Sequence, residues 1–584
     1  MSKNSSRIRI LKIVTFVTLA IITVRLFAIQ IIEYDDWVAK ANEQHILLET
    51  ITAKRGEIYM MDGQEPVPVV LNQTAYQIII DPAVTDKEVL RNTLESYAKD
   101  HISADLDEVY AIEGLRYYVV ARNVPYKSAQ QIAEKVNDGE LSGVWLKSSN
   151  QRVYPEGELG STLLGFVNAD GIGQYGVEGS LNKILSGKDG MLKTISDINN
   201  VALSIGSDNV KIPAEDGKDV VLSVDRGLER LVEEVLADHV NDTAATNAAA
   251  LVMNPNTGEV VAMTSLPNYD PADYGNVKSA AAYINQVTEV PYEPASICKN
   301  FAFSAAINEG KMTADTTYFN QGYEVIDGWK IMNAEQRSSI YGTISMRTAL
   351  YWSLNSGSIH ALMLLGDSEN EITKIGRERL YDYYHNKFRL GRATGIELIE
   401  AEGYIEDPNE GYGRDSTYAN MTFGQNLGIT MIQTASAFSA VINGGYWRTP
   451  TVIKGTIENG NIVPLNTNRE EEHILLESTS DMMRDMLINN RTWKVTAGID
   501  RPGYAIGGKS GTAQVIVDGS YDDTMSNLVG SYIGFVGPAG ELPQYVIMVK
   551  MWGEGSALSG AEAQNLFDSL SNRVIDYLKI KPVI

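Results

Sequence analysis

The stretch YEPASICKN, residues 292–300, holds a serine, a cysteine and a lysine within four positions. Ser296 and Lys299 are three apart, so on a helix they share one face, with Cβ atoms about 5–6 Å apart. Serine is a poor nucleophile until a neighbouring base accepts its proton. Lysine becomes such a base near neutral pH when burial or a nearby cation lowers its pKa. Because Pro294 suits the first turn of a helix, the spacing predicts a helix that carries a serine nucleophile and a lysine base.

Cys298 is the only cysteine of the chain. It follows Ser296 by two positions, which on a helix turns it about 200° away. A thiol nucleophile needs a neighbouring base, and no histidine is close in sequence, although His360 is a candidate in space. We interpret Cys298 as a small buried packing residue, with a catalytic thiol as the alternative.

The serine–lysine spacing alone is a weak signal, because SLNK at residues 180–183 has it too. Two further motifs follow Ser296: SLN at residues 353–355, and KSGT at residues 509–512, which holds the only K-[ST]-G of the chain. The earlier SLNK lies before a predicted domain boundary, and no second S-x-N follows it in its own domain. We therefore place the chemistry at Ser296 and the two later motifs.

The apolar pattern predicts the elements that position these motifs. VVLSVD at residues 220–225 predicts a strand, and a helical pattern follows behind an Asp225 cap. Residues 249–265 predict a hairpin, and residues 296–450 are rich in helical patterns. Three late strands are predicted at residues 511–517, 529–536 and 543–551. This order favours an antiparallel sheet with a helical cluster packed against it.

A separate domain is predicted before this one. It mixes short helices, such as WVAKANEQ at residues 37–44, with short strands such as AYQIIID and YYVVARNV. The polar stretch IPAEDGKD, residues 212–219, marks its end. Four parts are predicted: a cytoplasmic tail at 1–12, a transmembrane anchor at 13–32, a pedestal at 33–215 and a catalytic domain at 216–584.

The N-terminus has the charge and length of a membrane anchor. Residues 13–32 are about as long as a helix that crosses the hydrocarbon core. Arg25 interrupts them near the far end, where it either snorkels to the interface or meets a partner helix. Four cations precede the span, which predicts a cytoplasmic tail and an exported body. A cleaved signal peptide is the alternative, with Ala39-Lys40-Ala41 as its cleavage site.

Composition excludes several classes of function. The first 32 residues carry +5 of a net charge of −25, so the remainder carries −30, and an acidic body does not suit a nucleic-acid binder. One cysteine excludes an intrachain disulfide and any multi-cysteine metal site. The six histidines are scattered, so a zinc hydrolase is not expected, and no metal or cofactor is predicted.

In this order, S-x-x-K, S-x-N and K-[ST]-G form the motif set of serine-acylating penicillin-binding enzymes. The chain resembles the class B penicillin-binding proteins over nearly its whole length. Further matching stretches lie at residues 54–63, 173–190, 254–263, 423–445 and 530–538. The resemblance implies an α+β fold: a penicillin-binding/β-lactamase-like transpeptidase domain, with an antiparallel sheet and helices on both sides. An elongated mixed α/β pedestal domain of the dimerisation type and one transmembrane helix precede it.

The resemblance also implies residue roles. Ser296 attacks the penultimate D-alanine of a peptidoglycan stem peptide, and Lys299 is its base. Ser353 relays a proton to the leaving amine, and Asn355 holds Lys299 and the substrate amide. An amine on a neighbouring stem peptide then attacks the acyl-enzyme and forms a cross-link, whereas β-lactams trap Ser296.

The K-[ST]-G motif has implied roles in substrate binding. Lys509 lies on an edge strand, where its charge favours the substrate carboxylate, and Ser510 and Thr512 hydrogen-bond that carboxylate. Gly511 lets the strand backbone approach the substrate. The backbone N–H groups of Ser296 and Thr512 form the oxyanion hole.

The implied partners are stem peptides, β-lactams, a polytopic SEDS-type glycosyltransferase and other division-complex membrane proteins in the bacterial cell membrane. Residues 33–215 are too few for the glycosyltransferase domain of class A. The short pedestal favours the septal, division-specific branch, with the elongation branch as the alternative. A β-lactam-hydrolysing enzyme and a mainly scaffolding division protein also remain open.

Overall fold

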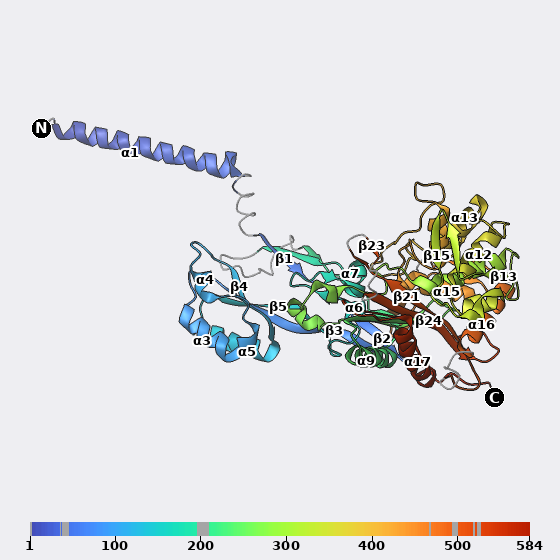
Figure 1. The fold of residues 1–584 in the computed structure, drawn as a ribbon. Coiled ribbons are helices and arrows are strands. Elements are labelled where there is room, and N and C mark those ends of the chain that lie inside the picture. The colour runs from blue at the N-terminus through green and yellow to red at the C-terminus, as the bar shows by residue number, and fades with distance from the viewer. Residues whose placement is uncertain are drawn as a thin grey trace. The chain divides into compact units, whose positions relative to one another are not determined.

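Figure 1 shows the computed structural model of the chain. It describes residues 3–34, 37, 46–195, 210–465, 469–492, 500–517, 520–521 and 527–583. Apart from Trp37, the helix expected at residues 37–44 lies outside them. The chain divides into two compact units: residues 1–56 with 186–217, and residues 57–185 with 218–584. Each unit is described by itself.

The first unit begins with a long apolar helix. α1 (Lys3–Phe27) continues into a π-helical turn (Ala28–Ile32), and the apolar stretch Ile8–Ile32 is long enough to cross a membrane. It covers the predicted span. The guanidinium of Arg25 forms an ion pair with Glu33 at 3.0 Å, so this cation has a partner within its own segment. The same unit holds an antiparallel sheet in the order β1 (Ile46–Ile51), β8 (Gly190–Ile195), β9 (Val210–Ile212).

The second unit begins with a sheet built around one long strand. β3 (Glu65–Ile80) pairs antiparallel with β2 (Ile58–Asp62), β4 (Tyr118–Pro125) and β5 (Val144–Val153). Helices α3 (Lys87–Tyr97) and α5 (Tyr126–Asn137) pack against it around Ile78 and Leu90 (Figure 1). YYVVARNV forms β4 as predicted, whereas the predicted short strand AYQIIID is the end of the much longer β3.

A five-stranded antiparallel sheet forms the centre of the remainder. Its order is β12 (Val260–Leu266), β11 (Asn247–Met253), β25 (Tyr545–Trp552), β24 (Leu528–Pro538), β21 (Tyr504–Gln514). One face packs against α9 (Arg226–Asp242) and α17 (Gly560–Tyr577) through alternating strand residues such as Ala250 and Val549. The other face, with Leu251 and Met548, joins the core of the helical cluster. The predicted sheet with helices on both sides is confirmed.

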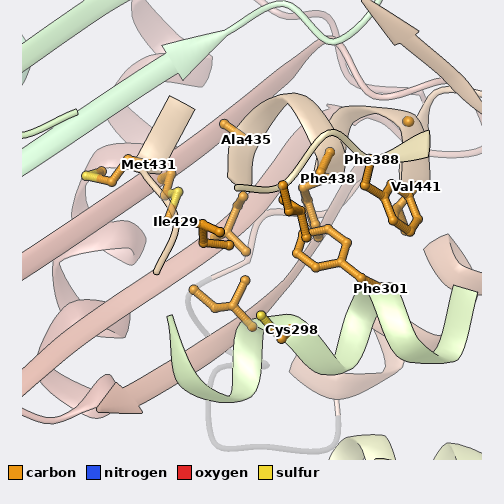
Figure 2. Close-up of a cluster of buried hydrophobic side chains, with 14 of the residues drawn as sticks. Cys298, Phe301, Phe388, Ile429, Met431, Ala435, Phe438 and Val441 are labelled. Atoms are coloured by element: carbon orange, nitrogen blue, oxygen red, sulfur yellow. The ribbon is translucent and has the colours of Figure 1, made fainter. Parts of the chain in front are cut away.

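The helical cluster is held together by a large apolar core. α10 (Lys299–Asn308) is buried almost throughout, and α12 (Asn355–Leu365) and α15 (Met431–Ile442) pack against it. Figure 2 shows the contact region, where Cys298 and Phe301 point toward Phe388, Ile429 and Phe438. This apolar core fixes the start of α10, which is where Lys299 lies.

The edge strand begins earlier than predicted. β21 starts at Tyr504 rather than at residue 511, because the glycines that weaken its sequence pattern are required by packing. A Cβ on Gly507 would lie 2.4 Å from the Phe535 ring, and one on Gly508 would lie 2.5 Å from the Tyr532 ring. Strand propensity therefore underestimates the length of this strand, because aromatic rings of a neighbouring strand pack where side chains at Gly507 and Gly508 would be.

One sheet contains strands from both sides of the predicted boundary between residues 215 and 216. β10 (Val220–Asp225) pairs parallel with β2 and antiparallel with β18 (Ile453–Glu458). The strand, the Asp225 cap and the following helix are as expected. The domain division itself stays a prediction.

Asp225 gives a first test of this junction. Its carboxylate caps α9 at Gly227 and Leu228 and also accepts hydrogen bonds from Gly63 N (2.9 Å) and Tyr577 Oη (2.6 Å). We expect Asp225→Ala to lower the free energy of unfolding by about 3 kcal/mol, because two part-buried hydrogen bonds from distant segments are lost as well as the cap.

Asp86→Ala is the matched control, because Asp86 only caps α3. Its expected cost is about 1 kcal/mol. Urea unfolding of the detergent-solubilised chain measures both variants, and equal losses would contradict the junction role of Asp225.

Candidate active site

Ser296 lies on a tight turn that leads into α10. The turn is one 3₁₀ segment, Ala295–Cys298, so the single helix predicted from the sequence begins as a 3₁₀ turn. Side chains three apart still lie over one another in this geometry. Ala295 has a positive φ of 50°, and its N–H donates to Gly424 O at 3.2 Å. The loop at Gly424 thus holds a strained backbone directly before the serine.

Lys299 brings the first two motifs together. Its Nζ lies 2.9 Å from Ser296 Oγ and 2.9 Å from Asn355 Oδ1. It also lies 2.6 Å from the Ser353 carbonyl oxygen and 3.2 Å from Ser353 Oγ. The side chain is 1% exposed. Burial lowers the pKa of Lys299 to about 7, so a substantial fraction of this amine is neutral at physiological pH.

The contacts of Lys299 suit a neutral amine. A neutral amine has two N–H groups and one lone pair. The Ser353 carbonyl accepts only, and Asn355 presents its amide oxygen because its Nδ2 donates to Met332 O at 2.9 Å. With both N–H groups directed to these oxygens, the lone pair is left for the hydroxyl proton of Ser296. The geometry is that of a serine beside a general base.

A buried polar network holds the S-x-N segment. Ser353 has a positive φ of 56° between α11 (Met346–Tyr351) and α12. Ser356, one residue after the motif, contacts Asn320 Oδ1 (3.1 Å), Asn333 Nδ2 (3.0 Å) and Tyr318 Oη (3.0 Å). The sequence analysis did not identify these residues, since their only common property is position in space.

The K-[ST]-G motif lies on the edge strand β21, as expected. Ser510 and Thr512 line the same cavity as Ser296. Thr512 Oγ1 accepts from Gly560 N at 2.8 Å, so its hydroxyl proton is available for donation. Lys509 is 4% exposed and donates to Ser510 O at 2.9 Å, so it supplies charge from within the strand.

The structure gives a different reason for Gly511 from the one inferred from sequence. A Cβ there would lie 2.4 Å from Pro294 O and 2.8 Å from Ser531 Oγ. The glycine therefore admits the backbone of the segment that carries the nucleophile, and its role in substrate approach stays a prediction. Close approach of β21 to this segment sets the distance between Thr512 and Ser296.

A cavity of about 390 Å³ opens beside these groups. Its lining adds residues that the sequence analysis did not single out: Ala295, Ala334, Glu335, Trp352, Phe423 and Gln425. Phe423 and Gln425 lie in a stretch covered by the family resemblance, whereas Glu335 follows a hairpin with no motif. Among the described residues, no group of three or more His, Cys, Asp or Glu side chains has the arrangement to hold a metal ion.

Cys298 lies in the core behind the site. It is fully buried in the cluster of Figure 2, and burial raises the pKa of its thiol. The ring of His360, the candidate base, stacks on Tyr318 instead. These observations support the packing interpretation. The SLNK of the pedestal places Ser180 at the end of one short helix and Lys183 in the next.

Comparisons with known proteins agree with this geometry. The profile of the penicillin binding protein transpeptidase domain matches residues 248–572, and that of the penicillin-binding protein dimerisation domain matches residues 50–222. The serine next to a buried lysine and an edge strand lies within the matched transpeptidase domain. The chain belongs to the penicillin-binding proteins, and its two domains make it a class B member.

Individual relatives extend the comparison. Stage V sporulation protein D of Bacillus subtilis is 30% identical over 72% of this chain and 63% of its own length. Penicillin-binding protein PbpB of Mycobacterium tuberculosis is 29% identical over 68% of this chain and 57% of its own. The chain thus spans less than two thirds of these relatives. Peptidoglycan D,D-transpeptidase MrdA of Escherichia coli is 26% identical over 76% of this chain and 73% of its own.

Solved structures share the fold. A peptidoglycan synthetase from Bifidobacterium adolescentis has a TM-score of 0.70 and 22% identity, covering 92% of this chain and 98% of that one. Penicillin Binding Protein 2X from Streptococcus thermophilus has the same TM-score and identity, covering 91% of this chain and 80% of that one.

Gly511→Ala tests the close approach of β21. We expect it to lower the free energy of unfolding by about 1–3 kcal/mol, because the new methyl group overlaps the Pro294 carbonyl. Gly275→Ala is the control, since its Cβ would meet no atom within 4 Å and should change stability by less than about 0.5 kcal/mol. Thermal unfolding compares the two. An unchanged free energy of unfolding in Gly511→Ala would show that the structure accommodates a methyl group at this position.

Proposed function

We propose that the protein is a serine D,D-transpeptidase that cross-links peptidoglycan stem peptides through an acyl-enzyme on Ser296. The observation that carries this proposal is the buried amine of Lys299, which contacts Ser296, Ser353 and Asn355 at one end of an open cavity. Relatives named peptidoglycan D,D-transpeptidases support the choice of reaction.

Acylation begins with proton transfer from Ser296 Oγ to Lys299 Nζ. The oxygen attacks the carbonyl carbon of the penultimate D-alanine and forms a tetrahedral oxyanion. Backbone N–H groups of Ser296 and Thr512 stabilise this oxyanion, and one such donor lowers the barrier by about 2.7–4 kcal/mol. The C–N bond then breaks, and the terminal D-alanine leaves with a proton that Ser353 relays from Lys299.

The second half-reaction reverses these roles. The amine of a neighbouring stem peptide attacks the ester carbonyl and loses a proton toward Ser353 and Lys299. Ser296 Oγ leaves and regains its proton, and the new amide is the cross-link. Hydroxyls of Ser510 and Thr512 hold the donor carboxylate during acylation, and the buried Lys509 beside them supplies positive charge. β-Lactams enter the same path but leave a stable ester.

The cellular setting is part of the proposal. The apolar helix Ile8–Ile32 supports a single-pass membrane anchor, and the four cations before residue 13 support a cytoplasmic N-terminus with an exported catalytic domain. We place the protein in the septal branch, with a SEDS-type glycosyltransferase supplying the glycan strands. Depletion distinguishes the branches: loss of a septal enzyme gives filaments, whereas loss of an elongation enzyme gives rounded cells.

Intact mass spectrometry after incubation with a fluorescent penicillin is the direct test. We expect one adduct per detergent-solubilised chain, lost in Ser296→Ala and retained in the control Cys298→Ala. The adduct should persist for hours, because a transpeptidase lacks efficient hydrolysis. Rapid loss would favour a β-lactam-hydrolysing enzyme, and no adduct on the wild type would favour a scaffold.

The pH dependence tests the base. Because the neutral form of Lys299 accepts the serine proton, acylation should slow as pH falls through the lysine pKa of about 7 and level off above it. Stopped-flow fluorescence between pH 5.5 and 8.5 measures the profile. Lys299→Arg, which stays protonated throughout, should be inactive at every pH. A flat wild-type profile would exclude Lys299 as the base.

A further inference from the structure

A third buried lysine, after Lys299 and Lys509, has no part in the chemistry above. Lys550 belongs to β25 and is 6% exposed. Its Nζ lies 3.3 Å from Gln286 O and 3.3 Å from Gln286 Oε1, and 4.9 Å from the ring centroid of Tyr292. Burying an ammonium group costs free energy, so its partners are informative about its role.

Lys550 is the central residue of one row across the five-stranded sheet. The strand registers place directly opposite one another Gly511, Ser531, Lys550, Ala249 and Ser265. Side chains of directly opposed residues point to the same face. This is the face of Met548 and Leu251, which joins the helical cluster. Lys550 is the only ionisable residue of the row.

The segment 285–297 ends in the turn that carries Ser296. It runs along this row from one edge of the sheet to the other. At one end, Gln286 N donates to Ser265 Oγ at 3.0 Å. In the middle, Lys550 contacts Gln286 and Tyr292. At the other end, Pro294 O presses on Gly511. The row therefore determines where Ser296 stands relative to the edge strand that carries Thr512.

We propose that Lys550 is a positioning residue that anchors the segment 285–297 to the sheet and so sets the distance between Ser296 and the backbone N–H of Thr512. This inference rests on the proposed acyl-enzyme function. Lys550 touches neither the cavity nor a reacting atom, and it acts through Gln286 and Tyr292.

The chemistry of lysine fits this role. Its four-carbon stem spans from the sheet to the segment, and its amine donates to two oxygens of one residue. Burial also lowers the pKa of Lys550 to about 7, and the amine has N–H donors in either protonation state. An apolar side chain of equal length fills the same space but leaves both Gln286 oxygens without this donor.

The experiment compares three variants of the full chain in detergent. Lys550→Met removes the donors and keeps the stem, and Lys550→Arg keeps donors. Val549→Ala is the matched control, because Val549 is the neighbouring buried residue but faces the core of α9 and α17. Acylation by the fluorescent penicillin is resolved into a binding constant and an acylation rate constant, and hydrogen–deuterium exchange follows the amides of 285–297.

Lys550→Met should lower the acylation rate constant roughly 10-fold and leave the binding constant within about twofold, since a misplacement of about 1 Å costs up to about 100-fold. Exchange in 285–297 should rise. Lys550→Arg should recover most of the rate. Val549→Ala should keep wild-type values of both, even with a comparable loss of thermal stability.

Two outcomes overturn the proposal: a wild-type acylation rate in Lys550→Met, or equal slowing in Val549→Ala. If Lys550→Met does not fold, Gln286→Ala takes its place, because the half-buried Gln286 is the other partner of the contact. If the wild type forms no adduct, the proposed function fails. Exchange then decides the anchoring: unchanged exchange of 285–297 in Lys550→Met overturns it.

Discussion

The site depends on keeping the amine of Lys299 out of contact with water. Removing the Lys299 side chain from water disfavours its charged form, which is what makes it a base near neutral pH. That burial is tolerated because oxygens of Ser353 and Asn355 meet its N–H groups. The oxygens of Ser353 and Asn355 must therefore be held in place by other contacts, and much of the surrounding structure provides them.

Two residues beside the lysine accept unfavourable backbone geometry. Ala295 and Ser353 are neither glycine nor asparagine, yet both have positive φ values. Such conformations cost about 1–3 kcal/mol each and persist where packing over-determines them. Here the packing comes from the loop at Gly424 and from the network around Ser356. Two of the strained residues of the chain thus lie directly beside the reacting atoms, where the buried helical cluster supports them.

The sequence identified the chemical groups better than their surroundings. Short fixed spacings predicted Ser296 and Lys299 correctly as neighbours, because residues three apart on a helical turn share one face. Strands such as β10 were predictable from the apolar pattern, and the α9 cap was predictable from the aspartate that precedes the helical pattern. The early start of β21 was missed because its glycines are explained by aromatic rings on another strand.

Other features depend on contacts between distant segments. Glu335 reaches the cavity from a loop with no local signal. The contact of Gly511 with the Pro294 carbonyl was not predictable, because Pro294 lies more than two hundred residues earlier in the chain. No sequence pattern distinguished Lys550 from other strand residues. Only the strand register and its contact with Gln286 place it beside the segment that carries the nucleophile.

The single thiol of the chain reports on transient opening of the helical cluster. Cys298 is fully enclosed by the core that supports the nucleophile. A thiol-specific reagent in solution can reach it only in molecules whose helical cluster has transiently separated. The rate of labelling therefore reports the free energy of that separation, at the residue two positions from the reacting serine and without any engineered probe.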